Sequence, residues 1–179
     1  MRRNSNKYVE CNILVDELLI TFYVKKGRRK MAEHHFHLTA QWKGGRLGEG
    51  RISVGNLVSA VSIPLEMNGP GVGTNPDEML VGAAATCYLI TLAAVLENRG
   101  IVPIDITLES EGIVTVEGNR PRFDKIIHRP AIMLANDVPE DLFHKVALLA
   151  ERAEKACMIS KAIHGNVEVM VEANVIMNA

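Results

Sequence analysis

Apolar and polar positions alternate along several short segments of this chain, as they do in half-buried β-strands. The pattern is clearest at residues 35–42, and strand-like segments follow at 51–54, 59–65, 105–117, 124–134 and 167–176. Glycine-rich stretches at 43–48 and 68–73 separate the first strands and indicate a turn and a loop. The pattern therefore predicts a chain rich in strands that are joined by tight connections.

One longer segment has a helical pattern and is apolar on nearly every side. It runs from Pro76 to about Asn98. Asn75 is a candidate N-cap, Pro76 falls at the first helical position, and Glu78 stands where a capping box requires an acid. Gly100 follows just past the predicted end. Such a helix must be buried on most faces, either in a core or against a second subunit.

A second helix is predicted from residues 137–140 to Lys155. The order along the chain is then strands, helix, two strands, helix and strand. This order favours an α+β fold in which a mostly antiparallel sheet packs on a central, largely apolar helix. That helix carries Cys87.

The composition of the chain restricts the classes of partner that the protein is expected to bind. The chain has 179 residues and 47% hydrophobic residues, enough for one domain with a core. A net charge of −1 and an aromatic content of 4% argue against nucleic acid and an anionic membrane surface. We expect no apolar run to reach the roughly 18 residues that span a bilayer. A cytoplasmic protein without a membrane partner is predicted, and the absence of Cys-x-x-Cys disfavours zinc.

Residues 1–30 differ from the rest because basic runs stand near both ends, at 2–3 and 25–30. One interpretation is a flexible or strand-forming N-terminal extension of a domain at 31–179. The alternative is that the run 25–30 is a translated ribosome-binding site before a true start at Met31, because Lys, Gly and Arg all have purine-only codons. Cys11 would then belong to no functional protein. A nucleotide sequence without a purine-rich element there would exclude this alternative.

Cys87 and Cys157 are the candidate reactive residues. Each could be a small buried hydrophobe. As a pair, one thiolate could attack an electrophile such as a peroxide oxygen and become a sulfenic acid, which the second thiol would convert to a disulfide. The attacking thiol needs a low pKa, whereas burial raises it. A cationic partner is therefore expected, and the candidates are Arg46, Arg51, Lys161 and His164.

Three further residues have both an ordinary and a functional interpretation. Arg46 follows two glycines and is either a solvated turn residue or a side chain aimed at the thiol. Asp77 and Glu78 fall in the first turn of the predicted helix, where carboxylates stabilise the helix by capping and by their interaction with its dipole.

Two segments resemble the OsmC/Ohr family of osmotically inducible and organic hydroperoxide resistance proteins. They are residues 73–76 leading to Cys87, and Cys157 leading to residues 164–167. The resemblance spans roughly residue 32 to the C-terminus. The first segment matches in turn, cap, proline and cysteine at the same spacing. The second segment has Met158 where the family often has a proline.

The resemblance implies a thiol peroxidase that reduces organic hydroperoxides and binds no metal or organic cofactor. Cys87 would be the peroxidatic and Cys157 the resolving cysteine, with Arg46 holding the thiolate. Asp77 aligns with an acid that is usually glutamate, so neighbouring Glu78 could serve instead. The family forms intertwined homodimers with active sites at the interface, and dihydrolipoyl groups are its typical dithiol reductants.

Helix geometry bears on this arrangement. Ten residues of continuous helix rise about 15 Å, which separates Asp77 from Cys87. We therefore expect a site that is shared between subunits or built on a distorted first turn. Two other interpretations stay open: a non-catalytic binding or redox-sensing module for small apolar or electrophilic molecules, and a structural dimer. Thiol-dependent ester hydrolysis is disfavoured because no histidine base is evident near Cys87.

Overall fold

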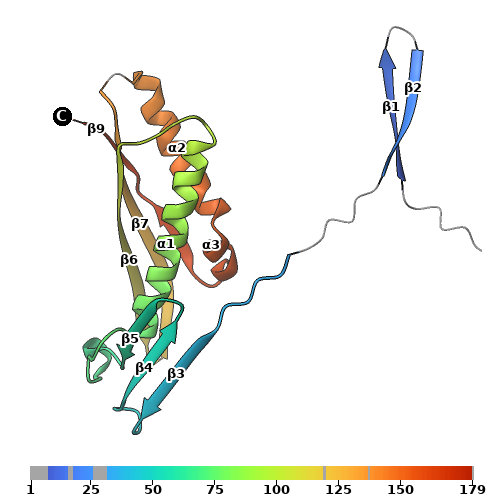
Figure 1. Ribbon diagram of the computed structural model, residues 1–179. Helices are drawn as coiled ribbons and strands as arrows, with labels where there is room; N and C mark the ends of the chain where they lie inside the picture. Colours follow the sequence, from blue (N-terminus) through green and yellow to red (C-terminus); the bar gives the residue numbers. More distant parts are fainter. Residues whose placement is uncertain (1–7, 16–17, 26–31, 119, 137, 179) are drawn as a thin grey trace, which may run out of the picture. The chain divides into compact units, whose positions relative to one another are not determined.

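The computed structural model describes residues 8–15, 18–25, 32–118, 120–136 and 138–178. The chain divides into two compact units, residues 1–37 and 38–179. In the first unit, β1 (Tyr8–Val15) pairs antiparallel with β2 (Leu18–Lys25) (Figure 1). Residues 26–31, which include most of the basic run and Met31, lie outside the described residues, so the alternative start stays a prediction.

The second unit begins with a three-stranded antiparallel sheet of β3 (Leu38–Lys43), β4 (Glu49–Val54) and β5 (Leu57–Val61). Two expected boundaries are wrong. The first strand begins at Leu38 instead of residue 35, and β5 ends at Val61, before a short 3₁₀-helix η1 (Leu65–Met67). Pro64 stands between them and has no amide to donate to a strand ladder, which explains the early end.

The helix predicted from residue 76 is present as α1 (Pro76–Glu97). Asn75 caps it, because its side chain accepts a hydrogen bond of 2.9 Å from the amide of Glu78. The capping box is not reciprocal, since the Glu78 carboxylate accepts from the Thr74 hydroxyl at 2.8 Å. Gly100 follows the helix with φ +70°, a left-handed conformation that suits glycine.

Of the two expected ways to bury α1, the core of its own chain covers only one side, and burial of the rest against a second subunit stays a prediction. The fully buried residues of α1 form one stripe with a spacing of four, Ala84, Tyr88, Leu92 and Leu96, whereas Ile90 is 71% exposed. The expectation that no apolar run reaches the length of a bilayer span is wrong, because α1 is long and apolar enough by length and composition to cross a membrane. A helix that packs in a protein core has the same composition.

A second sheet joins distant parts of the chain. Long strands β6 (Asp105–Glu117) and β7 (Arg120–Leu134) pair antiparallel. The single strand expected at residues 167–176 is instead two strands, β8 (Glu168–Val171) and β9 (Asn174–Met177), and both run parallel to β7. The fold is the expected α+β arrangement, with antiparallel sheets and one mixed sheet.

Two helices follow β7, α2 (Glu140–Ala156) and the short α3 (Met158–Ile163), which was not predicted. Helices α1 and α2 pack against each other on one face of the β6–β9 sheet (Figure 1). The core between these layers contains Tyr88, Leu92, Leu96, Ile101, Ile132, Leu134, Val146, Leu149, Ala150 and Ala153.

Close packing of α1 on the sheet depends on one glycine. A Cβ at Gly112 of β6 would lie 2.5 Å from Cγ2 of Val81 and 2.8 Å from the ring of Phe123. Both distances are shorter than van der Waals contact allows, so only glycine lets the helix approach the strand this closely.

Candidate active site

Cys87 lies halfway along α1, and Cys157 lies at the junction between α2 and α3. The backbone of Cys157 (φ −58°, ψ 129°) is extended, which ends α2 and starts α3 in a new direction. Cys157 is completely buried, whereas Cys87 is partly exposed. Both are free thiols, and they lie close enough together for the Cys157 side chain to lower the pKa of the Cys87 thiol. The fold thus brings together two cysteines that are far apart in the sequence.

Groups at the start of α3 lower the pKa of the Cys87 thiol. Burial raises the pKa of the Cys87 thiol, but hydrogen bonds from the Cys157 side chain, from the Ile159 and Met158 amides and from Thr91 outweigh this effect. The pKa of Cys87 therefore lies below its ordinary value. The first amides of a helix have no partner within it, so the thiolate satisfies donors that α3 leaves free.

Thr91 lies one turn after Cys87 on the same helix. Its hydroxyl donates a hydrogen bond of 2.8 Å to the carbonyl oxygen of Cys87. A threonine hydroxyl has only one hydrogen, so it can donate either to this carbonyl or to the Cys87 sulfur. Among the described residues, the amides of Met158 and Ile159 have no such competing acceptor. We therefore expect these amides, more than the Thr91 hydroxyl, to donate to the thiolate.

The other predicted site residues lie apart from Cys87 in the single chain. Arg46 is exposed in the turn between β3 and β4, and its guanidinium makes one long contact, 3.5 Å to the carbonyl of Met67. Asp77 and Glu78 lie in the first turn of α1. Among the described residues, no ion pair joins Arg46 to either acid. Within one chain, hydrogen-bond donors take the place of the expected cation.

A buried histidine lies behind α1. The ring of His128 on β7 stacks on Tyr88 at a centroid distance of 4.7 Å, and its Nδ1 is 2.7 Å from the Ser110 hydroxyl. Burial lowers the pKa of His128 to about 4, so the ring is neutral near pH 7. Burial and the Glu154 carboxylate raise the pKa of Tyr88. His128 is thus a core residue, and its ring contacts are with Tyr88 and Ser110.

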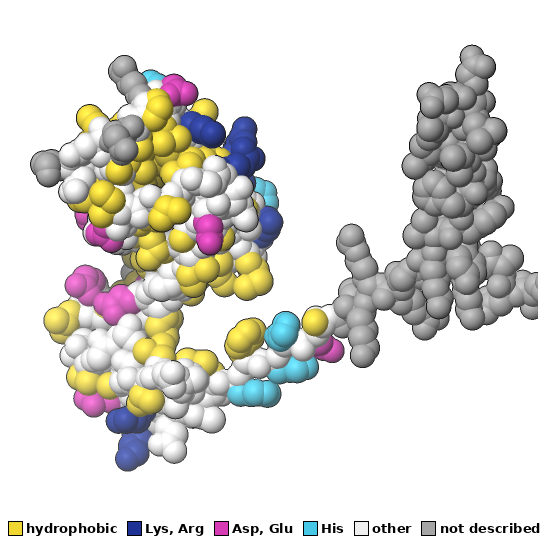
Figure 2. Space-filling model, turned by 45° about the horizontal axis from the view of Figure 1, so that its top comes forward, with side chains coloured by type: hydrophobic (Ala, Val, Ile, Leu, Met, Phe, Trp, Pro, Cys, Tyr) yellow, Lys and Arg dark blue, Asp and Glu magenta, His cyan; other side chains and the backbone are white. Residues whose placement is uncertain are grey.

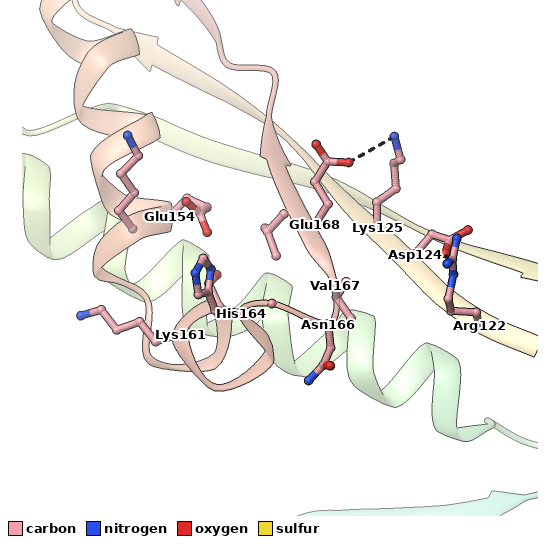
Figure 3. Close-up of a pocket in the computed structure, with 13 residues that line it drawn as sticks. Arg122, Asp124, Lys125, Glu154, Lys161, His164, Asn166, Val167 and Glu168 are labelled. Atoms are coloured by element: carbon pink, nitrogen blue, oxygen red, sulfur yellow. Dashed lines mark hydrogen bonds and ion pairs between the residues drawn. The ribbon is translucent and has the colours of Figure 1, made fainter.

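A hollow of about 980 Å³ lies beside α3. Its walls come from the ends of α2 and α3 and the starts of β7 and β8, with His164 and Glu154 directed toward its centre (Figure 3). Lys125 pairs with Glu168 at 3.5 Å along one wall, and Arg122 pairs with Asp124. Neither cysteine lines this hollow. It is therefore separate from the thiol pair.

Sequence analysis missed the short helix α3 and the residues it contributes. The pattern of residues 158–163, two apolar residues, two polar residues and two apolar residues before His164-Gly165, was a signal for a helical turn. Thr91 could have been found from its spacing of four from Cys87 on one helix. In the part of the chain that the structure describes, no cluster of His, Cys, Asp and Glu could hold a metal ion.

Comparison with known proteins identifies the family to which this chain belongs. The family model described as OsmC-like protein matches residues 69–172. The chain belongs to this family, and its thiol pair lies within the matched region. The uncharacterized protein YmaD of Bacillus subtilis is 55% identical over 148 residues, which cover 81% of this chain and 97% of that protein.

Other relatives carry functional names. An organic hydroperoxide resistance protein of Xanthomonas axonopodis pv. citri is 28% identical over 136 residues, covering 74% of this chain and 89% of that protein. A crystal structure of an organic hydroperoxide resistance protein from Legionella pneumophila matches with a TM-score of 0.63 and 22% identity, covering 79% of this chain and 99% of that chain. The structural match establishes the fold.

Proposed function

We propose that this protein is a cysteine-based peroxidase that reduces organic hydroperoxides to alcohols. The observation that carries the proposal is that the Cys87 thiol has a lowered pKa and lies close to the buried Cys157 side chain, which contributes to that lowering. A reactive thiolate with a resolving thiol beside it is the arrangement that a two-cysteine peroxidase requires. Relatives named organic hydroperoxide resistance proteins agree with this chemistry.

The reaction has two steps. The Cys87 thiolate attacks the distal oxygen of ROOH, the O–O bond breaks, and RO⁻ takes a proton to leave as the alcohol. Cys87 is thereby oxidised to a sulfenic acid. The Cys157 thiol then attacks the Cys87 sulfur, the S–O bond breaks, and hydroxide takes up the thiol proton to leave as water. Because the two side chains lie close to each other, the disulfide can form with little rearrangement. An external dithiol, of the dihydrolipoyl type, completes the cycle.

The surroundings of Cys87 favour an apolar peroxide. On α1, Ala83 and Ile90 flank Cys87 at the spacing of neighbours on a helix face, and both are exposed. Across from them, the side chain of Met158 is 71% exposed. Figure 2 also shows apolar side chains in several patches on the visible face of residues 38–179. An alkyl group on the peroxide would gain contacts here that hydrogen peroxide lacks.

The protein acts as a homodimer under this proposal, and the β3–β5 sheet provides the argument. Strand alternation and the pairing register place Leu38, Trp42 and Leu57 on one face of that sheet, together with buried Ile52. Leu38 and Leu57 are both 55% exposed and Trp42 is 47% exposed. A second copy that covers this face and the free side of α1 would bury these residues and could bring its Arg46 to Cys87.

A matched pair of variants tests the dimer. Leu57→Arg places a charge on the apolar face, whereas Val58→Arg places the same charge on the opposite face, where Val58 is 48% exposed. We expect Leu57→Arg to lower the solution mass from dimer to monomer and Val58→Arg to leave it unchanged. A wild-type protein that is monomeric at micromolar concentration would refute the dimer.

Activity is tested by the consumption of cumene hydroperoxide with excess dihydrolipoamide. Wild-type protein should turn over many times. Cys87→Ser should abolish turnover, and Cys157→Ser should accumulate a sulfenic acid that dimedone traps at Cys87. Stoichiometric oxidation without turnover would instead support a redox sensor. Two free, inert thiols in the folded protein would refute both interpretations and leave a binding module or a structural dimer. A cytoplasmic location, which would keep both thiols reduced, is part of the proposal.

A further inference from the structure

The two sulfurs of the thiol pair differ sharply in access, and this difference bears on how the oxidised protein is reduced. Cys157 has no exposed surface, because it lies at the α2–α3 junction with α1 in front of it. Cys87 is partly exposed. Association with a second chain can only cover more surface. Cys87 must nevertheless stay reachable if a peroxide reacts there, so this step of the argument rests on the proposed function.

Reduction of a Cys87–Cys157 disulfide could begin at either sulfur. Leaving-group stability favours attack on Cys157, because Cys87 would then depart as the thiolate that the Met158 and Ile159 amides stabilise. Access favours attack on Cys87. A thiolate must approach a disulfide sulfur along the S–S axis and touch it, and a sulfur without exposed surface cannot be touched unless α3 first unpacks. Leaving-group stability changes the rate by a finite factor, whereas complete burial prevents the encounter, so access decides.

We infer that the dithiol reductant attacks the Sγ of Cys87 and approaches it from the same exposed side as the peroxide. One thiolate of the reductant bonds to Cys87 Sγ while the Cys87–Cys157 bond breaks. The electron pair of that bond leaves on Cys157 Sγ, which takes a proton and returns to its buried thiol state. The reductant is now held on Cys87 as a mixed disulfide.

The second thiol of the reductant completes the exchange. It attacks the reductant's own sulfur in the mixed disulfide, which breaks the bond to Cys87 and closes the reductant into a cyclic disulfide. Cys87 leaves as a thiolate, and the amides of Met158 and Ile159 are in place to receive it. The stabilised thiolate is thus the leaving group of the last step, where it prepares the protein for the next peroxide. Two electrons pass from the dithiol to the protein disulfide.

The inference predicts where a monothiol is trapped. Full-length protein carrying Cys11→Ser is oxidised to the disulfide in two parallel samples, one with an equivalent of cumene hydroperoxide and one with diamide. Each sample is mixed briefly with N-acetylcysteine, which cannot complete the second displacement. It is then quenched in denaturant with iodoacetamide. Peptide mass spectrometry identifies which cysteine carries N-acetylcysteine and which carries the carbamidomethyl group.

We expect N-acetylcysteine on Cys87 and the carbamidomethyl group on Cys157, with an excess of about ten-fold or more over the reverse arrangement, because Cys157 is completely buried whereas Cys87 is partly exposed. An adduct mainly on Cys157 would overturn the inference and show that α3 opens before reduction. Failure of both oxidants to form the disulfide would also overturn it. If cumene hydroperoxide does not oxidise the protein but diamide does, and the adduct is on Cys87, the inference stands and the proposed peroxidase function falls.

Discussion

Replacing Met158 by proline should remove one hydrogen-bond donor from the Cys87 thiolate and change little else. Met158 is the first residue of α3, where proline is favoured because its missing amide hydrogen has no partner within the helix. The preceding residue, Cys157, has φ −58° and ψ 129°, a conformation that proline permits in its predecessor. The Met158 side chain is 71% exposed, so its loss removes few contacts. The fold should therefore survive the substitution.

The magnitude follows from the hydrogen bond that is lost. A hydrogen bond to a charged group contributes about 1.5–3 kcal/mol. One pKa unit corresponds to about 1.4 kcal/mol. Sulfur is a weak acceptor, Cys87 is partly exposed, and the Ile159 amide and the Cys157 side chain remain as donors. We therefore expect the pKa of Cys87 to rise in Met158→Pro and the thiolate fraction below that pKa to fall about ten-fold.

The assay is the rate of alkylation of Cys87 by iodoacetamide as a function of pH, measured by mass spectrometry of the Cys87 peptide. Met158→Leu is the matched control, because it changes the side chain and keeps the amide. Its alkylation profile should superimpose on that of the wild type. An unchanged profile in a folded Met158→Pro protein, or an equal shift in both variants, would refute the role of this amide.

Two other expectations concern stability. The pKa of His128 is lowered to about 4 from an unfolded value near 6.5, so neutral His128 stabilises the fold fully above pH 6.5 and this contribution is lost as the pH falls from 6.5 to 4. The loss amounts to about 3 kcal/mol. In His128→Gln, the difference between the urea midpoints at pH 7 and pH 4 should be smaller than in the wild type. In His144→Gln, where the histidine is exposed, this difference should stay as in the wild type. Gly112→Ala should destabilise the protein by about 1–3 kcal/mol through the clash with Val81. In a double-mutant cycle, adding Val81→Ala should recover part of that loss. Strictly additive effects of the two substitutions on the free energy of unfolding would contradict the packing argument.

Local chemistry in the sequence was enough to predict α1 and β6 almost to the residue. Asn75, Pro76 and Gly100 are signals that act within a few residues, because caps and left-handed turns depend on the backbone nearby. The same local reading identified Cys87 and Cys157 as the candidate pair. It did not predict that residues 168–177 form two strands parallel to β7, because strand pairing between segments far apart is not encoded in either segment alone.

Tertiary structure decided which groups surround the reactive sulfur. From the sequence, we expected a positively charged side chain beside the attacking thiol, and the Arg, Lys and His residues were the candidates. The folded chain instead presents two backbone amides at the start of α3, which no side-chain pattern reveals, because every residue except proline has an amide. Burial likewise separates two cysteines that look alike in the sequence. Packing of α1, α2 and α3 encloses Cys157 and leaves Cys87 partly exposed, and this difference in burial is the basis for the different roles that we propose for them.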